Sequence, residues 1–508
     1  MIEASSNSQA SELSPVDSRF IAIEEAPRRR ILLILTLLTL AGAWLRLWRL
    51  GAQSLWLDEG ATVALARASW RHFVWVWWHG EANLQTIYFL LMRGWVHGGL
   101  SESWLRLPSA LFGIASIPLL YLVARKFIGA SASLAAAALL AFSPAHVYFS
   151  QEARGYALAI LLALVSTYCF VSAVERNRAH DWAWWTIAGI AAFYTHDFAA
   201  LVLVAQAVSL LFLRGFAAWR RFLLCGSLIF VAAIPGLTYV FRASPENLHF
   251  VWMPRASPRE FWHLALFLGG GGVKIAIALG LWIAGIVAIF RNRRSAEPDS
   301  FWRGMLVLSW ALVPATILAL ISLHEPIFLD RYMVFSLPAT LLLAAIGADV
   351  LEKWKIGWIL VIALCALSLP TIAKQSRKPR EDWRGAANTI LASAAPGDAV
   401  VFFPFYTRIM LDYYGDRYGA SAPSLHVFAP AYYSGGEDAR DLLAALNRDP
   451  HQFRHVWMVV ADHGAGLQNF DQSDAMGKKL SAILGEAVIY KFTEVDVLEY
   501  GGASVGGR

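Results

Sequence analysis

The sequence predicts an all-α polytopic membrane protein of about eleven transmembrane helices, followed by a small C-terminal α/β domain. The first supporting observation is the composition: of 508 residues, 57% are hydrophobic and only 16% are charged, against about 25% charged in a typical soluble domain. The second is that the apolar residues form runs long enough to cross a bilayer, so lipid has to solvate much of this surface. The 22 tryptophans also suit side chains placed at membrane interfaces.

The first apolar run, from Ile31 to about Leu47, follows three consecutive arginines at positions 28–30. We expect a signal anchor with a cytoplasmic tail of residues 1–30, and a cleaved signal peptide is the alternative. Further runs of spanning length lie at 105–125, 131–149, 155–174, 182–196, 197–213, 221–241, 263–290, 302–323, 332–350 and 355–373.

Basic clusters between these runs predict the orientation of the helices, and they lie near residues 125, 176, 220, 293 and 353. All five fall at the ends of even-numbered helices, which is the cytoplasmic side if arginines 28–30 are cytoplasmic. The stretch 84–98 is short and carries Arg93 and His97. It is interpreted as an interfacial or re-entrant helix, because a span there would put every later basic cluster on the wrong side.

The chain is expected to divide into a transmembrane domain at 31–373 and a soluble domain at 374–508, with residues 51–104 as the first outer loop. In the soluble part, shorter patterns predict strands at 399–403, 455–460 and 487–490 and helices at 383–394 and 439–446. An odd number of spans places this α/β domain outside the cytoplasm.

The formal net charge of +6 does not indicate a nucleic-acid partner, because the basic residues sit in short clusters that orient helices. The cysteines at 169, 225 and 365 each lie inside an apolar run. Their spacing matches neither a disulfide framework nor a metal site.

Two adjacent carboxylates, Asp58 and Glu59, follow the first helix at the membrane surface and are flanked by Trp56 and Leu57. In the functional interpretation, one of them is a general base held where it can meet a lipid-borne substrate. In the alternative they are ordinary solvated acids at a helix end, because strongly perturbed carboxylates are a minority.

The other outer loops place more charged residues on the same face. Glu152 and Arg154 lie between two apolar spans, where a charge is costly and tends to be functional, although a mutual ion pair is the alternative. Arginines 106, 154 and 331 converge on the same face as Asp58, and a planar guanidinium suits a lipid phosphate. Snorkelling anchors are the alternative for each arginine. For His196 a structural hydrogen bond is the alternative to a role in the site.

Four motifs occur together and in order: the carboxylate pair after the first helix, the segment 102–113 (ESWLRLPSALFG), the segment 142–156 (FSPAHVYFSQEARGY), and Arg331-Tyr332 with Pro338. Over most of residues 31–373 the chain resembles the GT-C superfamily. The branch it resembles holds bacterial polyprenyl-phosphate-sugar-dependent transferases related to protein O-mannosyltransferases and the lipid A aminoarabinose transferase. The tail resembles the domain appended in some members, in residues 381–384 (EDWR) and 396–398 (PGD).

The resemblance implies that an acid of the first loop deprotonates an acceptor hydroxyl, which attacks a sugar carried by polyprenyl phosphate. By position it makes Asp58 the base, with Glu59 and Glu152 in support. It implies that Arg106, Arg154 and Arg331 hold phosphate or shape the cavity, and that the substrate-binding set also contains Tyr156, His196 and Tyr332. The expected partners are the polyprenyl-phosphate-sugar donor, membrane lipids and an unidentified extracytoplasmic acceptor. The expected location is the inner cell membrane, as a multi-pass protein.

One departure concerns the segment before the interfacial helix. Relatives often carry a His-Pro-Pro or Glu-Lys-Pro type sequence there, whereas this chain has residues 81–85, EANLQ, without proline or lysine. How the donor phosphate or the acceptor is contacted at this point is therefore open. No cofactor is expected and no metal is assigned, with weak coordination by carboxylates left open.

Two other classes of protein share some of these features. A transporter or flippase for a lipid-linked saccharide would have the spans and the arginines, but it would not need a base in the first loop and would more often show internal repeats. A catalytically inactive scaffold would use the tail to bind a partner. Loss of turnover with retained lipid binding on changing Asp58 distinguishes the enzyme from both.

Overall fold

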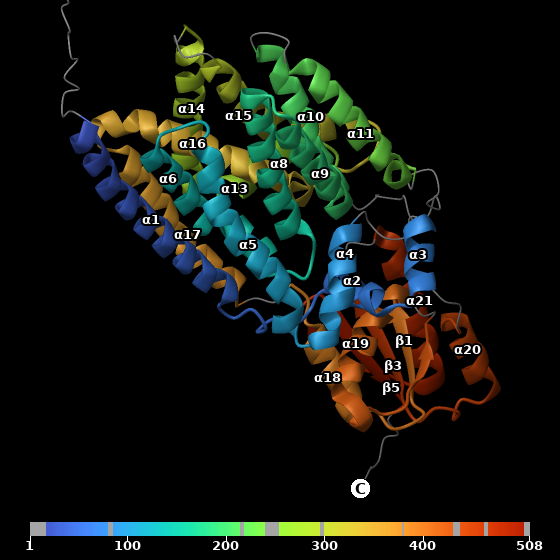
Figure 1. Ribbon diagram of the computed structural model, residues 1–508. Coiled ribbons are helices and arrows are strands. Elements are labelled where there is room, and N and C mark those ends of the chain that lie inside the picture. The colour runs from blue at the N-terminus through green and yellow to red at the C-terminus, as the bar shows by residue number, and fades with distance from the viewer. Residues whose placement is uncertain are drawn as a thin grey trace, which may run out of the picture.

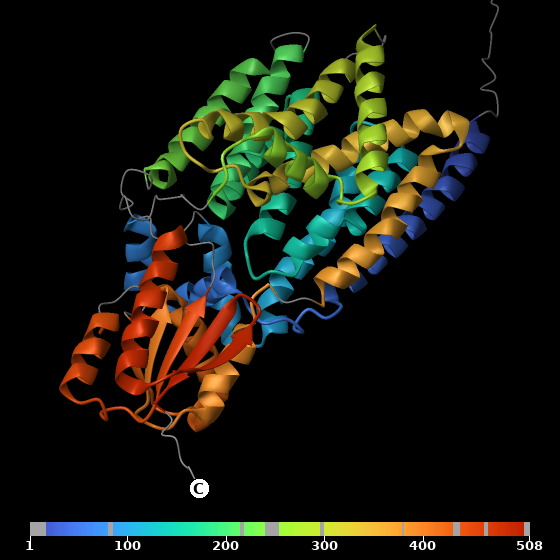
Figure 2. The same ribbon diagram turned by 180° about the vertical axis from the view of Figure 1, so that it is seen from behind.

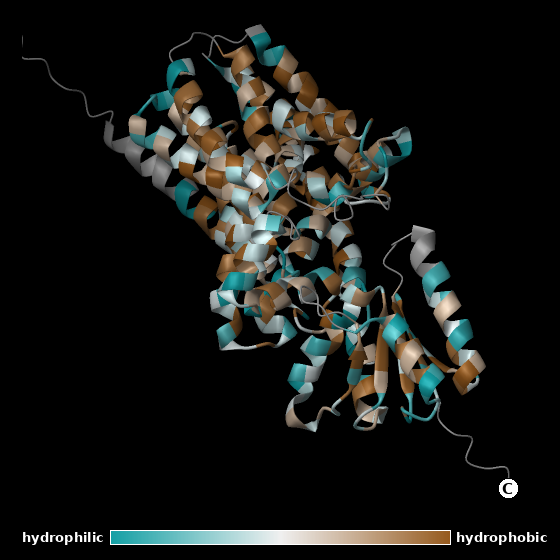
Figure 3. Ribbon diagram, turned by 90° about the vertical axis from the view of Figure 1, so that its right-hand side faces the viewer, coloured by the Kyte–Doolittle hydropathy of each residue, from teal (hydrophilic) through white to brown (hydrophobic). Residues whose placement is uncertain are grey.

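The structure, a computed structural model, describes residues 17–79, 85–213, 218–238, 253–294, 299–377, 380–429, 437–461 and 466–501. A bundle of long helices occupies one end, and a mixed sheet covered by helices occupies the other (Figures 1 and 2). Hydrophobic residues dominate the long helices, whereas the sheet domain mixes both kinds (Figure 3). This division agrees with the fold class that the composition predicts, a polytopic helical membrane protein with a small α/β domain.

Eight helices of the described residues are long and apolar enough to cross a membrane. They are α1 (Asp17–Leu47, apolar from Arg28), α5 (Glu102–Ala124), α8 (Tyr156–Arg176), α11 (Trp219–Leu237), α14 (Lys274–Arg291), α15 (Ser300–Ile321), η5 with α16 (Asp330–Ser336 and Leu337–Leu351) and α17 (Gly357–Gln375). A ninth is the bent pair α6 (Ala130–Ala141) and α7 (Pro144–Ser150). Two shorter apolar helical stretches correspond to the runs 182–196 and 197–213: α9 (Ala179–Thr195) and Asp197–Phe212, which contains α10 (Ala200–Ser209).

The run 131–149 is bent by 58° between α6 and α7. Pro144 starts the second helix, and Ser143 caps it by accepting a hydrogen bond from the His146 amide at 3.3 Å. The buried Arg46 of α1 donates to the carbonyls of Leu140 and Ala141, both at 3.1 Å. Because the carbonyl end of a helix carries partial negative charge, this cation stabilises the break.

The run 263–290 was expected to be one span and is not. It divides into α13 (Pro258–Leu268) and α14. Between them Gly270, Gly271 and Gly272 take positive φ angles of 86°, 73° and 56°. Glycine adopts this backbone conformation without steric penalty, and three in succession end the first helix.

The first outer loop forms three short helices, α2 (Leu57–Arg67), α3 (Trp70–His79) and α4 (Thr86–Trp95). With ten residues, α4 rises about 15 Å, which is too short to cross a bilayer. This agrees with the interpretation of 84–98 as a segment that does not span. Helix α3 packs Phe73 and Val76 inward and exposes Trp70, Trp75 and Trp78, a pattern typical of helices at a membrane interface.

The soluble domain contains α18 (Trp383–Ser393), β1 (Ala399–Phe403), α19 (Arg408–Tyr418), β2 (His426–Phe428), α20 (Ala439–Arg448), β3 (Val456–Ala461), α21 (Gly466–Leu484), β4 (Val488–Phe492) and β5 (Val495–Tyr500). The sheet order is β2-β1-β3-β5-β4, with β1 parallel to β2 and β3 and the β4–β5 hairpin antiparallel. The predicted strands and helices are all present. Strands β2 and β5 were not predicted.

The first loop and the soluble domain touch each other, so they must lie on the same side of the membrane. The positive-inside pattern predicts that this side is extracytoplasmic. A reporter active only outside the cytoplasm should therefore work when fused after Leu57 or near Gly419, and it should be silent after Lys126 or Arg293. A silent reporter at Gly419 would contradict the orientation.

Candidate active site

Helix α2 begins at Leu57 and carries both candidate carboxylates in its first turn. Acidic side chains are favourable there because the amide end of a helix carries partial positive charge. Successive residues of an α-helix point about 100° apart, so Asp58 and Glu59 face different surroundings. The two neighbours therefore have separate roles in the structure.

Glu59 is fully buried and completely paired. Its oxygens accept hydrogen bonds from Arg106 Nε at 2.8 Å and Nη2 at 2.6 Å. The amides of Ala153 and Trp56 donate to the same carboxylate, at 2.7 and 3.2 Å. These contacts tie α2 to α5 and to the loop before α8, so Glu59 holds the site together instead of facing a substrate.

Arg106 has no N–H donor left for a phosphate. Besides the two bonds to Glu59, Nη1 donates to the carbonyls of Leu50 and Gln53, and Nη2 donates to that of Ser54. All five guanidinium donors are thus engaged by the protein. Of the two roles that the resemblance implies for Arg106, these contacts favour shaping the cavity over holding phosphate.

Asp58 points the other way and keeps 32% of its side chain exposed. Its Oδ2 lies 3.8 Å from Arg154 Nη2 and 3.8 Å from Arg331 Nη1. These distances exceed hydrogen-bonding range. Asp58 is therefore an accessible carboxylate between two guanidinium groups.

The buried Arg154 is held by its Nη1, which donates at 3.3 Å to the Asp58 carbonyl and at 3.3 Å to the Thr62 hydroxyl. Its Nε has no hydrogen-bond partner among the described residues. Arg331 comes from η5, and its side chain is 19% exposed. Two guanidinium forks beside one open carboxylate suit an oxyanion bound next to Asp58.

Three predicted substrate-binding residues form a buried aromatic wall near these arginines. The His196 ring lies 5.3 Å from that of Tyr156 and 6.0 Å from that of Tyr332. His196 Nδ1 is 3.0 Å from a carboxylate oxygen of Asp197. The fold thus brings together residues from α8, the end of α9 and η5.

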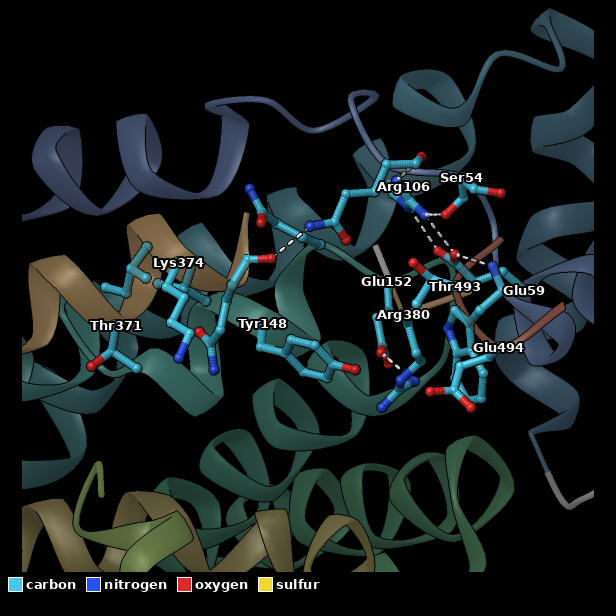
Figure 4. A pocket seen from close by; sticks show the side chains of 16 residues that line it. Ser54, Glu59, Arg106, Tyr148, Glu152, Thr371, Lys374, Arg380, Thr493 and Glu494 are labelled. Atoms are coloured by element: carbon cyan, nitrogen blue, oxygen red, sulfur yellow. Dashed lines mark hydrogen bonds and ion pairs between the residues drawn. The ribbon is translucent and has the colours of Figure 1, made fainter. Parts of the chain in front are cut away.

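Glu152 faces a cation that was not among the predicted site residues. Arg380 Nη1 donates to Glu152 Oε1 at 2.8 Å (Figure 4). The Arg380 guanidinium also stacks over the Trp56 ring, 3.8 Å from its centroid. Burial raises the pKa of the Glu152 carboxyl; the charge of Arg380 opposes this rise, and that of Glu59 adds to it. The sequence signal was weak, because Arg380 only adjoins the recognised segment 381–384.

A cavity of about 350 Å³ opens beside this pair. Its lining combines the helical bundle with the soluble domain, which contributes Arg380 and the hairpin turn at Thr493 and Glu494 (Figure 4). Arg106 and Lys374, the latter at the end of α17, are the other cations of the lining. Asp58 does not line this cavity, but it lies on the helix turn next to Trp56 and Glu59, which do.

The segment that enters the soluble domain grips the loop before Asp58. Glu381 accepts a hydrogen bond from the Leu57 amide at 2.9 Å, and Arg384 donates to the carbonyls of Gly51 and Gln53 and to Glu102. Helix α19 packs on α2 where a side chain at Gly60 would come within 2.3 Å of the Met410 sulfur. Contacts from the helical bundle and from the soluble domain therefore hold the loop before Asp58 in place.

The described residues contain no group of three or more His, Cys, Asp and Glu side chains that could hold a metal ion. The segment 80–84, which includes Glu81, lies outside the described residues. The expectation that no metal or other cofactor is used therefore stays a prediction. The setting of Asp58 between two arginines favours an anion over a cation.

Comparison with known proteins finds one family match and several similar solved structures. Residues 83–240 match the dolichyl-phosphate-mannose-protein mannosyltransferase family, and this stretch contains Arg106, Glu152, Arg154 and His196. The fold is shared over nearly the whole chain with a solved ArnT structure. This family match and the shared fold agree with the resemblance drawn from the four sequence motifs.

The structure is similar to ArnT from Cupriavidus metallidurans in the apo state, with a TM-score of 0.62, 16% identity, and coverage of 95% of this chain and 100% of that one. For the same enzyme bound to undecaprenyl phosphate the TM-score is 0.56 and the identity 15%, with coverage of 93% of this chain and 99% of that one. For the Archaeoglobus fulgidus oligosaccharyltransferase in complex with zinc and sulfate the TM-score is 0.51 and the identity 14%, with coverage of 92% of this chain and 73% of that one. No curated protein matches the chain by sequence.

We expect Arg106→Gln to destabilise the protein strongly, because it leaves the Glu59 carboxylate buried without its cation. Breaking such a buried pair costs about 3–5 kcal/mol. The matched control is Arg67→Gln at the exposed pair with Asp416, where the loss should be about 1 kcal/mol or less. Thermal unfolding in detergent measures both variants, and equal melting temperatures for the two would contradict the role given to Arg106.

Proposed function

We propose that the protein transfers a sugar from a polyprenyl-phosphate donor to an extracytoplasmic acceptor hydroxyl on a glycan, lipid or protein. Asp58 acts as the general base. The observation that carries this proposal is the division between the two carboxylates: Glu59 is completely paired, whereas Asp58 is accessible and lies between Arg154 and Arg331. The undecaprenyl phosphate bound by the ArnT of similar fold supports the class of donor.

The reaction is a single displacement with inversion. The acceptor hydroxyl gives its proton to a carboxylate oxygen of Asp58 as its oxygen bonds to the anomeric carbon. The bond between that carbon and the phosphate oxygen breaks, and polyprenyl phosphate leaves with the electron pair. Arg154 and Arg331 stabilise the charge that develops on the phosphate.

The remaining residues act through position. Glu59 and Arg106 hold the first turn of α2, so that Asp58 keeps its orientation relative to the arginines. Tyr156, His196 and Tyr332 close the site behind the arginines and supply aromatic surface. We place this site and the soluble domain on the outer face of the inner membrane, because the basic clusters require that orientation.

The match to a mannosyltransferase family favours the enzyme over the transporter and scaffold alternatives. Neither explains why one of two adjacent acids is kept open beside two cations while the other is fully paired. No observation in the described residues favours transport as a second function.

Asp58→Asn should keep the fold and lose turnover. The amide has nearly the same size but cannot accept the acceptor's proton, and positioned general bases contribute about 10²–10⁴-fold. Sugar transfer from a purified polyprenyl-phosphate donor in nanodiscs measures turnover, and donor binding is measured in parallel. Near-normal turnover of Asp58→Asn would refute the assignment of the base.

Arg154→Lys and Arg331→Lys should weaken donor binding although the charge is kept. A lysine cannot reproduce the planar pair of donors that grips two phosphate oxygens. Loss of such a bond corresponds to roughly 10-fold or more in affinity. If both lysine variants bind the donor normally, the two arginines are membrane anchors and not phosphate ligands.

A further inference from the structure

The cavity beside Glu152 contains the guanidinium group of Arg380, which is placed to exchange its carboxylate partner for another anion. We propose that Arg380 binds the phosphate of the lipid-linked donor, and that it leaves Glu152 for the phosphate when the donor enters. This inference rests on the proposed function and adds a binding residue supplied by the segment between the helical bundle and the soluble domain.

The first support is the way in which Arg380 is held. Its guanidinium carbon lies over the Trp56 ring, 3.8 Å from the ring centroid, and 5.0 Å from the centroid of the Tyr148 ring. Stacking of this kind positions a guanidinium without using its N–H donors. Among the described residues the hydrogen bond that Arg380 donates is the one from Nη1 to Glu152, and 35% of its side chain is exposed. The edge of the fork can therefore turn to a new acceptor while the stack stays in place.

The second support is the charge that the cavity offers. Arg106 also lines it, but all of its donors are engaged. Arg154 and Arg331 do not line this cavity but flank the adjoining Asp58, and the charge of Arg331 reaches Arg380, so one phosphate at this boundary can meet all three guanidinium groups. Arg380 and the exposed Lys374 are thus the cations of this cavity that can meet an anion, and Arg380 is the one with a preset orientation.

The third support is the shape of the space around Tyr148. A second cavity, of about 420 Å³, shares Tyr148, Thr371 and Gln375 with the first and continues past Pro144, Leu266 and Phe267. One end of the combined space is polar and contains Arg380 and Lys374. The other runs mainly along apolar residues of α7 and α13, and it also meets His263 and Asp330. This arrangement suits an amphiphile with an anionic head and a hydrocarbon chain, which is the chemistry of a polyprenyl phosphate.

The exchange has a consequence for protons. Glu152 is buried, and charged or titratable groups face it from every element packed around it. The cations are Arg380 from the segment that enters the soluble domain, Arg154 from its own loop and Arg331 from η5. The other groups are the carboxylates Asp58 and Glu59 from α2 and the tyrosines Tyr148 from α7, Tyr88 from α4 and Tyr156 from α8. Once Arg380 turns to phosphate, burial and the carboxylates favour the neutral form of Glu152. Donor binding then takes up a proton from solvent, and affinity should rise as the pH falls.

The test uses the full-length protein in nanodiscs of neutral phospholipid, with undecaprenyl phosphate as the probe. Arg380→Gln should weaken affinity by roughly 10-fold to 100-fold. Glu152→Gln should act in the opposite direction, because it frees Arg380 and needs no proton. It should bind more tightly than the wild type at mildly alkaline pH. Its remaining pH dependence should be that of the phosphate monoester itself, which titrates near about pH 6.

The controls separate this inference from a structural brace and from the proposed function. Arg380→Lys keeps a cation for Glu152 and should fold normally while still losing affinity, and Arg67→Gln should bind as the wild type does. Unchanged affinity of Arg380→Gln and Arg380→Lys would overturn the inference, as would weaker binding by both Arg380→Gln and Glu152→Gln. If the wild type does not bind undecaprenyl phosphate at any pH, the proposed function itself fails.

Discussion

The buried pair of Glu59 and Arg106 is the interaction on which the rest of the site depends. It joins the first turn of α2, the start of α5, the loop at residues 50–54 and the amide of Ala153 in one network. Each buried charge is matched, and each guanidinium donor has an acceptor, which is the condition under which ions are tolerated away from water. This network also fixes the position of Asp58, because Asp58 adjoins Glu59 on the same helix turn.

The geometry of a helix turns two adjacent carboxylates into two different groups. A rotation of about 100° per residue puts one acid into the protein and leaves the other at the surface of the site. The sequence analysis assigned the base to Asp58 by resemblance, and in the structure Asp58 is the more exposed member of the pair. It gave Arg106 a share in phosphate binding that its contacts do not favour, because the partner that engages this arginine lies 47 residues away.

The soluble domain is part of the active region and not an appendage to it. Its entry segment fixes the loop before Asp58 through Glu381 and Arg384, and it contributes Arg380 to the cavity beside Glu152. The turn between β4 and β5 reaches the same cavity (Figure 4). Because several charged contacts hold the soluble domain against the loop before Asp58, we expect a shift of the domain to move the loop as well.

The sequence alone determined the membrane class, most of the spans and much of the secondary structure of the soluble domain, because these depend on local periodicity and composition. It missed the break at Gly270–Gly272, since apolar composition hides a local change of backbone conformation. Only the tertiary structure decided which acid is paired, which arginine is engaged and that Arg380 meets Glu152 across 228 residues of sequence. Pairings between charges distant in the chain leave no periodic signal, because they arise where separate helices and domains pack together.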